Sequence, residues 1–67
     1  MIEIELNGAA HQVAQGSSLQ ALIASLALEN QALALAVNRQ VVRRERWHDQ
    51  QLQAGDKVDV VRAIGGG

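Results

Sequence analysis

The sequence predicts an α+β domain of two layers, in which one helix packs on one face of a mixed β-sheet. Three observations predict this class: alternating apolar residues at the start, one amphipathic helical segment after them, and several short strand-like segments beyond it. The order is strand, strand, helix, strand, short strand, strand. A crossover of this kind is expected to be right-handed. With 67 residues and no internal repeat, the chain is long enough for one small domain.

The first two strands form a predicted hairpin. Residues 2–6 alternate Ile or Leu with Glu, the period of a half-buried strand. Asn7 and Gly8 follow, and this pair favours a two-residue turn because both positions require positive φ. A second strand is expected over residues 10–14, and Gly16 ends it.

The helix is predicted from a capping signal and an apolar stripe. Ser17 and Gln20 have capping-box spacing, so Ser17 is expected to cap the helix. Asn30 is expected to close the helix in a left-handed conformation. The stripe, at helical spacing, consists of Leu19, Leu22, Ile23 and Leu26.

Three more strands are predicted after the helix. Residues 33–37 are continuously apolar, and residues 38–40 form a turn into a short strand at 41–42. The polar segment 43–53 is anchored by Trp47 and Leu52, and Trp47 is expected to be a structural lid on the core. Residues 54–56 then form a turn.

The last strand is predicted over residues 58–64, which gives a sheet of four or five strands with one main helix on one face. This arrangement is the β-grasp, or ubiquitin-like, roll. We expect residues 1–64 to form this domain and residues 65–67 to form a flexible glycine tail.

Composition excludes several functions. The net charge is −1 with both signs interspersed, which argues against nucleic acid as the ligand. The chain has no Cys, so it has no disulfide or thiol nucleophile. No apolar run has the length of a membrane span, and a cytoplasmic location is expected. His11 and His48 lack ligand partners at metal spacing, and His48 is expected to form a surface pair with Asp49. The arginines at 39, 43, 44 and 46 are expected to solubilise a loop.

The glycine tail is the candidate functional element. Gly65, Gly66 and Gly67 have no Cβ atoms and extend about 10 Å. A tail of this kind is able to enter a narrow slot and place a carboxylate in a partner's active site. Val61 and Ala63 alternate with the inward-facing Val58 and Val60, so they are expected to form a docking surface beside the tail.

The chain resembles the ThiS-type sulfur carriers of thiamine biosynthesis over essentially its whole length. The Pro that is common before the first Arg of this family's Pro-Arg-x-x-Trp stretch is replaced by Arg43, and Gly65 stands where Ala is frequent. The resemblance rests on segments 2–8, 35–42, 44–47, Leu52, 55–56 and 61–67.

The resemblance implies a protein co-substrate and not an enzyme. In such carriers a ThiF-like adenylyltransferase uses ATP to adenylate the terminal glycine, here Gly67. Sulfur from a cysteine desulfurase system then replaces AMP and leaves a thiocarboxylate, which supplies thiazole synthase. The chain itself would bind no cofactor.

Three alternatives remain open from the sequence. The small subunit of molybdopterin synthase (MoaD-like) shares the fold and the Gly-Gly end, but that family tends to be longer. A ubiquitin-like modifier would join the same activated glycine to target lysines. A plain binding module would leave the tail inert, and the fold alone does not decide among these functions.

Overall fold

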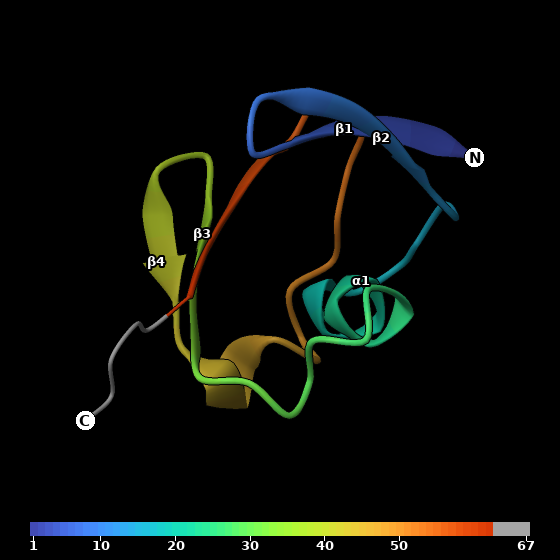
Figure 1. Cartoon of the computed structure of the whole chain (residues 1–67). Coiled ribbons are helices and arrows are strands. Elements are labelled where there is room, and N and C mark those ends of the chain that lie inside the picture. Colours follow the sequence, from blue (N-terminus) through green and yellow to red (C-terminus); the bar gives the residue numbers. More distant parts are fainter. Residues whose placement is uncertain (63–67) are drawn as a thin grey trace.

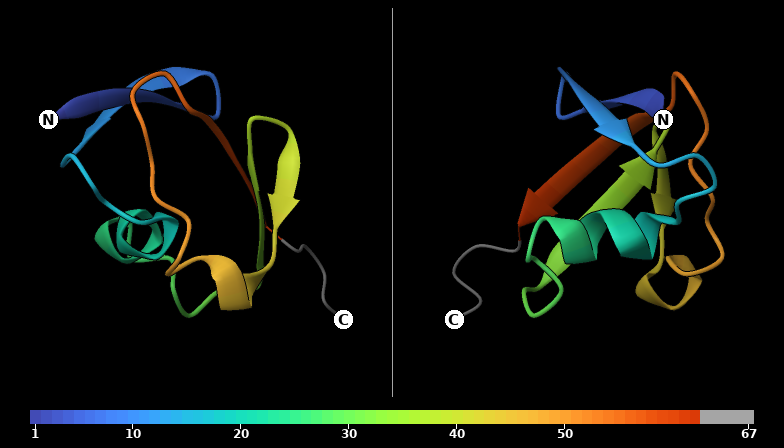
Figure 2. Two further views of the ribbon diagram at one scale, coloured as in Figure 1. Left: turned by 180° about the vertical axis from the view of Figure 1, so that it is seen from behind. Right: turned by 90° about the vertical axis from the view of Figure 1, so that its right-hand side faces the viewer.

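One five-stranded sheet and one helix make up residues 1–62, the part of the chain that the computed structural model describes (Figure 1). The strand order is β2-β1-β5-β3-β4, with β1 and β5 parallel and the other neighbouring pairs antiparallel. The helix lies on one side of the sheet (Figure 2). The predicted β-grasp architecture is therefore confirmed. The elements are β1 (Ile2–Leu6), β2 (Ala9–Val13), α1 (Leu19–Ser25), β3 (Leu33–Val37), β4 (Gln40–Val42), a 3₁₀ turn (Arg44–Arg46) and β5 (Lys57–Arg62).

The turn between β1 and β2 has the predicted geometry. Asn7 has φ 49° and Gly8 has φ 85°, as a two-residue hairpin turn of this kind requires. Ala9 consequently pairs with Leu6 directly across the turn. This pairing starts β2 at Ala9, one residue earlier than the sequence predicted.

The prediction that Ser17 caps the helix is wrong, because the cap is Ser18. The Oγ atom of Ser18 accepts a hydrogen bond from the N–H of Ala21 at 3.0 Å. Ser17 is held in the preceding turn: its N–H donates to the carbonyl of Ala14, and its carbonyl accepts from Leu52. These backbone bonds move the start of the helix one residue along the chain.

The prediction that Asn30 closes the helix is also wrong. The residue with left-handed backbone is Ala27, at φ 58°. Its N–H donates to the carbonyl of Ala24, and the next N–H, of Leu28, donates to Ile23. These two bonds are those of a Schellman motif, and Leu28 packs against the core as the motif favours. Burial of Leu28 fixes the end of the helix although Ala is not the usual residue for positive φ.

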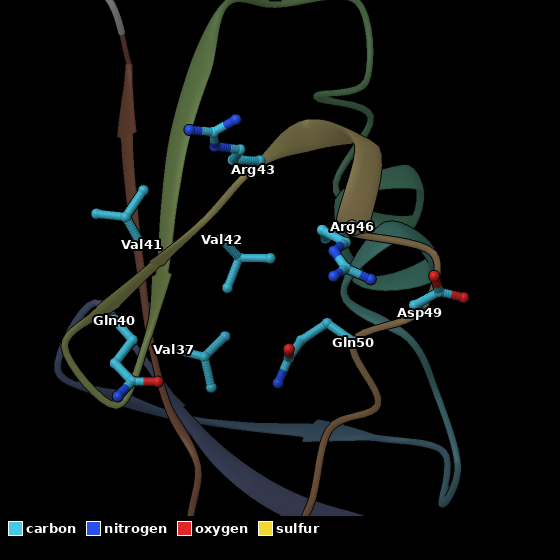
Figure 3. Close-up of a pocket in the computed structure, with 8 residues that line it drawn as sticks. All are labelled: Val37, Gln40, Val41, Val42, Arg43, Arg46, Asp49 and Gln50. Atoms are coloured by element: carbon cyan, nitrogen blue, oxygen red, sulfur yellow. The ribbon is translucent and has the colours of Figure 1, made fainter.

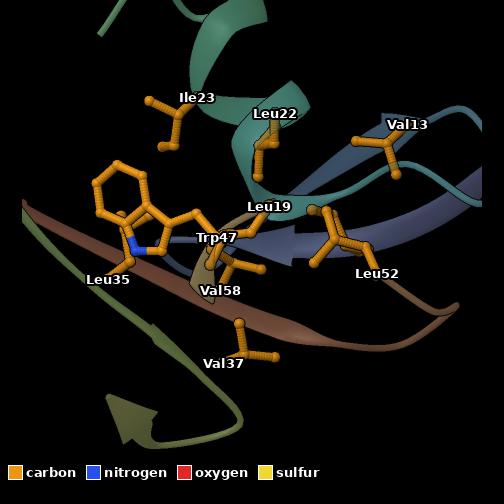
Figure 4. Close-up of a cluster of buried hydrophobic side chains, with 10 residues drawn as sticks. Val13, Leu19, Leu22, Ile23, Leu35, Val37, Trp47, Leu52 and Val58 are labelled. Atoms are coloured by element: carbon orange, nitrogen blue, oxygen red, sulfur yellow. The ribbon is translucent and has the colours of Figure 1, made fainter. Parts of the chain in front are cut away.

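The core lies between α1 and the inner face of the sheet (Figure 4). Trp47 is 1% exposed, and its Nε1 donates a hydrogen bond to the carbonyl of Val42 at 2.9 Å. The predicted anchors Trp47 and Leu52 are thus both buried, and Trp47 closes the core as a structural residue. The buried residues are Ile4, Val13, Leu19, Leu22, Ile23, Leu35, Val37, Trp47, Leu52 and Val58.

Arg44 does more than solubilise its loop. Its Nη2 donates to the carbonyl of Gln31 at 2.8 Å, and its Nη1 to that of Glu29 at 3.4 Å. The guanidinium carbon also lies 4.8 Å from the centroid of the Trp47 ring, within range of a cation–π contact. Arg44 therefore ties the connection between α1 and β3 to the lid over the core. The expectation of a merely solubilising group is wrong for this arginine.

Candidate functional site

Strand β5, which leads toward the predicted tail, occupies the middle of the sheet. It pairs with β1 through Leu6 opposite Val58, and with β3 from Val37 opposite Val58 to Leu33 opposite Arg62. β1 pairs with only the first two residues of β5, whereas β3 pairs with β5 up to Arg62, the last residue that the structure describes. The sheet thus positions the backbone of β5 up to Arg62.

Two asparagines in tight turns hold β5 from its two sides. Asn7, after β1, accepts a hydrogen bond from the N–H of Val60 through Oδ1 at 2.8 Å. Asn38, after β3, accepts from the N–H of Lys57 through its own Oδ1 at 3.0 Å. Both asparagines have positive φ, a conformation that Asn tolerates better than most residues. Each asparagine oxygen thus accepts a hydrogen bond from a β5 amide at a point where the neighbouring strand, β1 or β3, has already ended.

The face of the sheet opposite α1 carries an apolar region over β3, β4 and β5. Val41 is 78% exposed and Val61 is 60% exposed. In the strand register Val61 lies opposite Ala34, and Val41 lies opposite Ala36, so the four side chains share this face. We call Ala34, Ala36, Val41 and Val61 the apolar face. Exposed apolar groups gathered in this way are typical of a surface that meets a partner.

The sequence predicted the exposure of Val61, and the structure confirms it. Val41 was missed as a member of this surface, together with Ala34 and Ala36. The signal was the adjacent pair Val41-Val42 in a short strand, since one of two successive strand residues must face away from the core. Val42 faces inward and is half-buried. The strand order then places Val41 and Val61 on one surface.

The other predicted site residues lie outside the described part of the chain. They are Ala63 of the docking surface and the tail residues Gly65, Gly66 and Gly67. The predicted end of the last strand, residues 63 and 64, also lies outside it. Their roles therefore stay predictions, and the structure positions only the strand that precedes them.

An open hollow of about 470 Å³ lies between β4 and the segment after it. In Figure 3, Val37 and Val42 point to this side of β4, while Val41 points to the other side. Arg43, Arg46 and Asp49 line the hollow as well. Val41 also lines the hollow, so the hollow adjoins the apolar face at this residue.

The histidines do not mark a site. The imidazole Nε2 of His48 lies 3.4 Å from a carboxylate oxygen of Asp49, and both side chains are exposed. This is the predicted surface pair. Within residues 1–62, no group of three or more His, Cys, Asp or Glu is arranged to hold a metal ion. No helix among these residues has the length and apolar character of a membrane span.

A mixed sheet of this strand order, with a single helix packed on one face, gives the described residues a ubiquitin-like fold. The crystal structure of the thiamine biosynthesis protein ThiS from Geobacter metallireducens has the same fold: the TM-score is 0.85, with 98% of this chain and 100% of that chain covered at 23% identity. A family model described as the ThiS family matches residues 3–67. The chain belongs to the ThiS family.

Two relatives agree with this membership. The sulfur carrier protein ThiS of Escherichia coli (strain K12) is 35% identical over 66 residues, which are 98% of this chain and 100% of that protein. A thiazole synthase of Magnetococcus marinus is 35% identical over 66 residues, which are 98% of this chain but 20% of that protein. The family predicted from the sequence motifs is therefore confirmed.

Proposed function

We propose that this chain is a sulfur carrier of thiamine biosynthesis that carries sulfur as a thiocarboxylate on the carbonyl carbon of Gly67. The observation that carries the proposal is the family match, which extends through Gly67 at the end of the glycine run. The E. coli protein similar to this chain over its full length is itself a sulfur carrier. In the proposal, residues 1–64 form the folded domain and residues 65–67 the tail.

The chemistry requires activation by a second protein, because a carboxylate has no good leaving group. A ThiF-like adenylyltransferase joins the Gly67 carboxylate to AMP from ATP and releases pyrophosphate. A persulfide from a cysteine desulfurase system then attacks the carbonyl carbon, and AMP leaves. A thiol of the donor system reduces the resulting acyl disulfide to the thiocarboxylate. The chain is a co-substrate in these steps, which take place in the cytoplasm, and ATP is bound by the partner.

The apolar face and the tail have different tasks in this proposal. Val61 and Val41 dock on the partner, together with Ala63. Gly65 and Gly66 pass through a slot too narrow for side chains and bring Gly67 to the ATP. The exposure of both valines supports this division, because it places apolar surface on β4 and on β5, the strand that leads into the proposed tail. The asparagine bonds to β5 support it by holding the strand that precedes the proposed tail.

Thiazole synthase is the proposed acceptor of the sulfur. The M. marinus thiazole synthase contains a stretch similar to nearly all of this chain. The presence of a carrier-like stretch and a thiazole synthase in one polypeptide is consistent with direct transfer of sulfur from the carrier to the synthase. The same apolar face is then used twice, first at the adenylyltransferase and then at the synthase. Such a carrier must dissociate between the two steps, so we expect modest affinity for each partner.

Intact-mass spectrometry tests the proposed function. The chain is incubated with the adenylyltransferase, the desulfurase system, cysteine and ATP, after the starting mass has verified that Gly67 is the last residue. The expected product is heavier by the exchange of one oxygen for one sulfur. A chain that lacks Gly67 is the matched control and is expected to keep its mass. No exchange in the full chain, with partners that load another carrier, would refute the proposal.

A further inference from the structure

The outer edge of β2 offers unpaired backbone groups for another strand. β2 is a terminal strand of the sheet. A two-residue turn makes Leu6 and Ala9 a hydrogen-bonded pair, and hydrogen-bonded and non-hydrogen-bonded pairs then alternate along the hairpin. Ala10 and Gln12 therefore belong to non-hydrogen-bonded pairs, and their N–H and C=O groups point away from β1. No backbone bond from these two residues to another segment is found within residues 1–62. An open edge of this kind is a template for strand addition.

The two edges of the sheet differ in their protection. β4, at the other edge, has three residues, and the arginines at 39 and 43 stand directly before and after it. β2 has five residues and contains neither a charged Lys, Arg, Asp or Glu nor a Pro. Charged residues and Pro are the usual devices that keep an edge from pairing. β2 lacks them, so it is the edge that is open to a partner.

A groove beside this edge accommodates an apolar side chain. It has a volume of about 270 Å³ and lies between β2 and α1. His11 and Val13 line it from the strand, and Ala21, Leu22 and Ser25 from the helix. The lining combines small and apolar side chains with the polar His11 and Gln12. A residue added opposite His11 would direct its side chain to this side of the sheet.

The other side of the same edge is acidic next to β2, and Lys57 of β5 lies on the far side of Glu5 from this edge. Glu5 lies opposite Ala10, and Glu3 lies opposite Gln12, all on the face away from α1. Ala10 has a short side chain, so a long side chain on an added strand is able to reach across it to Glu5. Residues added opposite Ala10 and Gln12 lie on this acidic face. Basic residues complement it at both positions.

We propose that β2 pairs in antiparallel fashion with an extended segment of a partner protein. The three central residues of this segment are basic, aliphatic and basic. The aliphatic side chain occupies the groove, and the two basic side chains lie over the acidic face. The apolar face belongs to β3, β4 and β5, so this edge is free while that face is engaged. A second copy of the chain fits less well. It would place Ala10 and Gln12 opposite each other and bring no cation to Glu3 and Glu5, of which only Glu5 has a basic neighbour in the sheet, Lys57.

Titration with a peptide tests this inference in the intact chain. The probe is acetyl-Thr-Lys-Val-Lys-Thr-amide, and the control is acetyl-Thr-Glu-Val-Glu-Thr-amide with the same apolar centre. Amide chemical shifts are recorded by NMR during each titration. The Lys peptide is expected to shift the amides of Ala10, Gln12 and Ala21, to slow hydrogen exchange at Ala10 and Gln12, and to bind more weakly as ionic strength rises. The Glu peptide is expected to leave these amides unchanged.

Charge variants give the test a second arm. Replacement of both glutamates (Glu3→Gln with Glu5→Gln) is expected to weaken binding of the Lys peptide roughly 2- to 10-fold, as loss of two exposed ion pairs implies. Asp59→Asn, on the same face but away from β2, is expected to leave binding unchanged. The spectrum without peptide verifies that each variant is folded.

Four results would overturn the inference. They are equal binding of the two peptides, shifts centred on Val41 and Val61, no shift at about 2 mM peptide, and concentration-dependent shifts at Ala10 and Gln12 without any peptide. The last result would show that a second copy of the chain occupies the edge.

Discussion

The side-chain oxygen of Asn7 accepts a hydrogen bond from the backbone N–H of Val60 at 2.8 Å, across 53 residues of sequence. Asn7 also donates its own N–H to the carbonyl of Val58 at 2.9 Å. One turn residue therefore continues the ladder of β5 after β1 has turned away. The strand that leads to the proposed tail depends on a residue near the other end of the chain.

The first prediction concerns this bond. Asn7→Gly keeps the positive φ but removes the acceptor, so it is expected to lower the free energy of unfolding by about 0.5–1.5 kcal/mol. Exchange of the Val60 amide is expected to become faster. Asn7→Asp keeps an acceptor oxygen and is the matched control, with stability close to wild type. Urea unfolding and hydrogen exchange by NMR measure both effects. Equal protection of Val60 in all three proteins would contradict this assignment.

The second prediction concerns the end of the helix. Ala27 has φ 58°, where glycine meets no steric penalty from a Cβ atom. Ala27→Gly is expected to raise the free energy of unfolding by about 0.5–1 kcal/mol, because relief of the left-handed strain exceeds the entropic cost of Gly. Ala24→Gly, inside α1, makes the same chemical change in right-handed helix and is expected to lower it by about 0.5–1 kcal/mol. Thermal and urea unfolding compare the two; changes of the same sign would rule out the described helix end.

The third prediction concerns the position where the family commonly has Pro. Arg43 has φ −67° and ψ 150°, which proline adopts without strain, and its N–H makes no backbone bond to the rest of residues 1–62. Val42, before it, is in a strand, as a residue before Pro prefers. Arg43→Pro is therefore expected to stabilise the domain by about 0.4–1 kcal/mol.

Two controls accompany this substitution. Arg43→Ala separates the loss of the arginine from the gain of the ring. Arg46→Pro removes the N–H that donates to the carbonyl of Arg43 at 2.8 Å, so it is expected to destabilise the domain. Urea unfolding of the three variants ranks them; a destabilised Arg43→Pro protein would mean that the backbone before the 3₁₀ turn differs from that described.

The fourth prediction concerns the apolar face. Val61→Asp and Val41→Asp are each expected to slow adenylation by the ThiF-like enzyme roughly tenfold at subsaturating carrier, the effect of a charge placed in an apolar interface. Both side chains are exposed, so the variants are expected to fold. Ala24→Asp, on the exposed side of α1, is the control with an unchanged rate. Pyrophosphate exchange measures the rate, and a folded Val61→Asp protein with the wild-type rate would remove this docking surface.

The strands were predictable because their signals are local. Alternation over residues 2–6 and the Asn7-Gly8 pair place the first hairpin to within one residue. The helix ends were not predictable in the same way. Ser17 and Ser18 offer the same capping chemistry, and the backbone bonds of Ser17 to Ala14 and Leu52 decide between them. Ala27 carries no sequence signal for positive φ, since burial of the next residue imposes it.

The candidate site was predictable only where its signal is local to one strand. Alternation in the last strand showed that Val61 faces outward. The contribution of Val41 depends on strand order, which places β3 between β4 and β5. The partners of Arg44 are carbonyl groups of Glu29 and Gln31, and contacts with the backbone leave no pattern in the side-chain sequence.

In the proposed function, the carboxyl group of Gly67 is the group that receives sulfur. The most direct test compares two semisynthetic chains that differ only at this group, one ending in the free acid and the other in an amide. Both are incubated with the adenylyltransferase, the sulfur donor system and ATP, and their masses are measured. We expect exchange of one oxygen for sulfur in the acid and no change in the amide. Equal uptake of sulfur by the amide chain would contradict the proposed function.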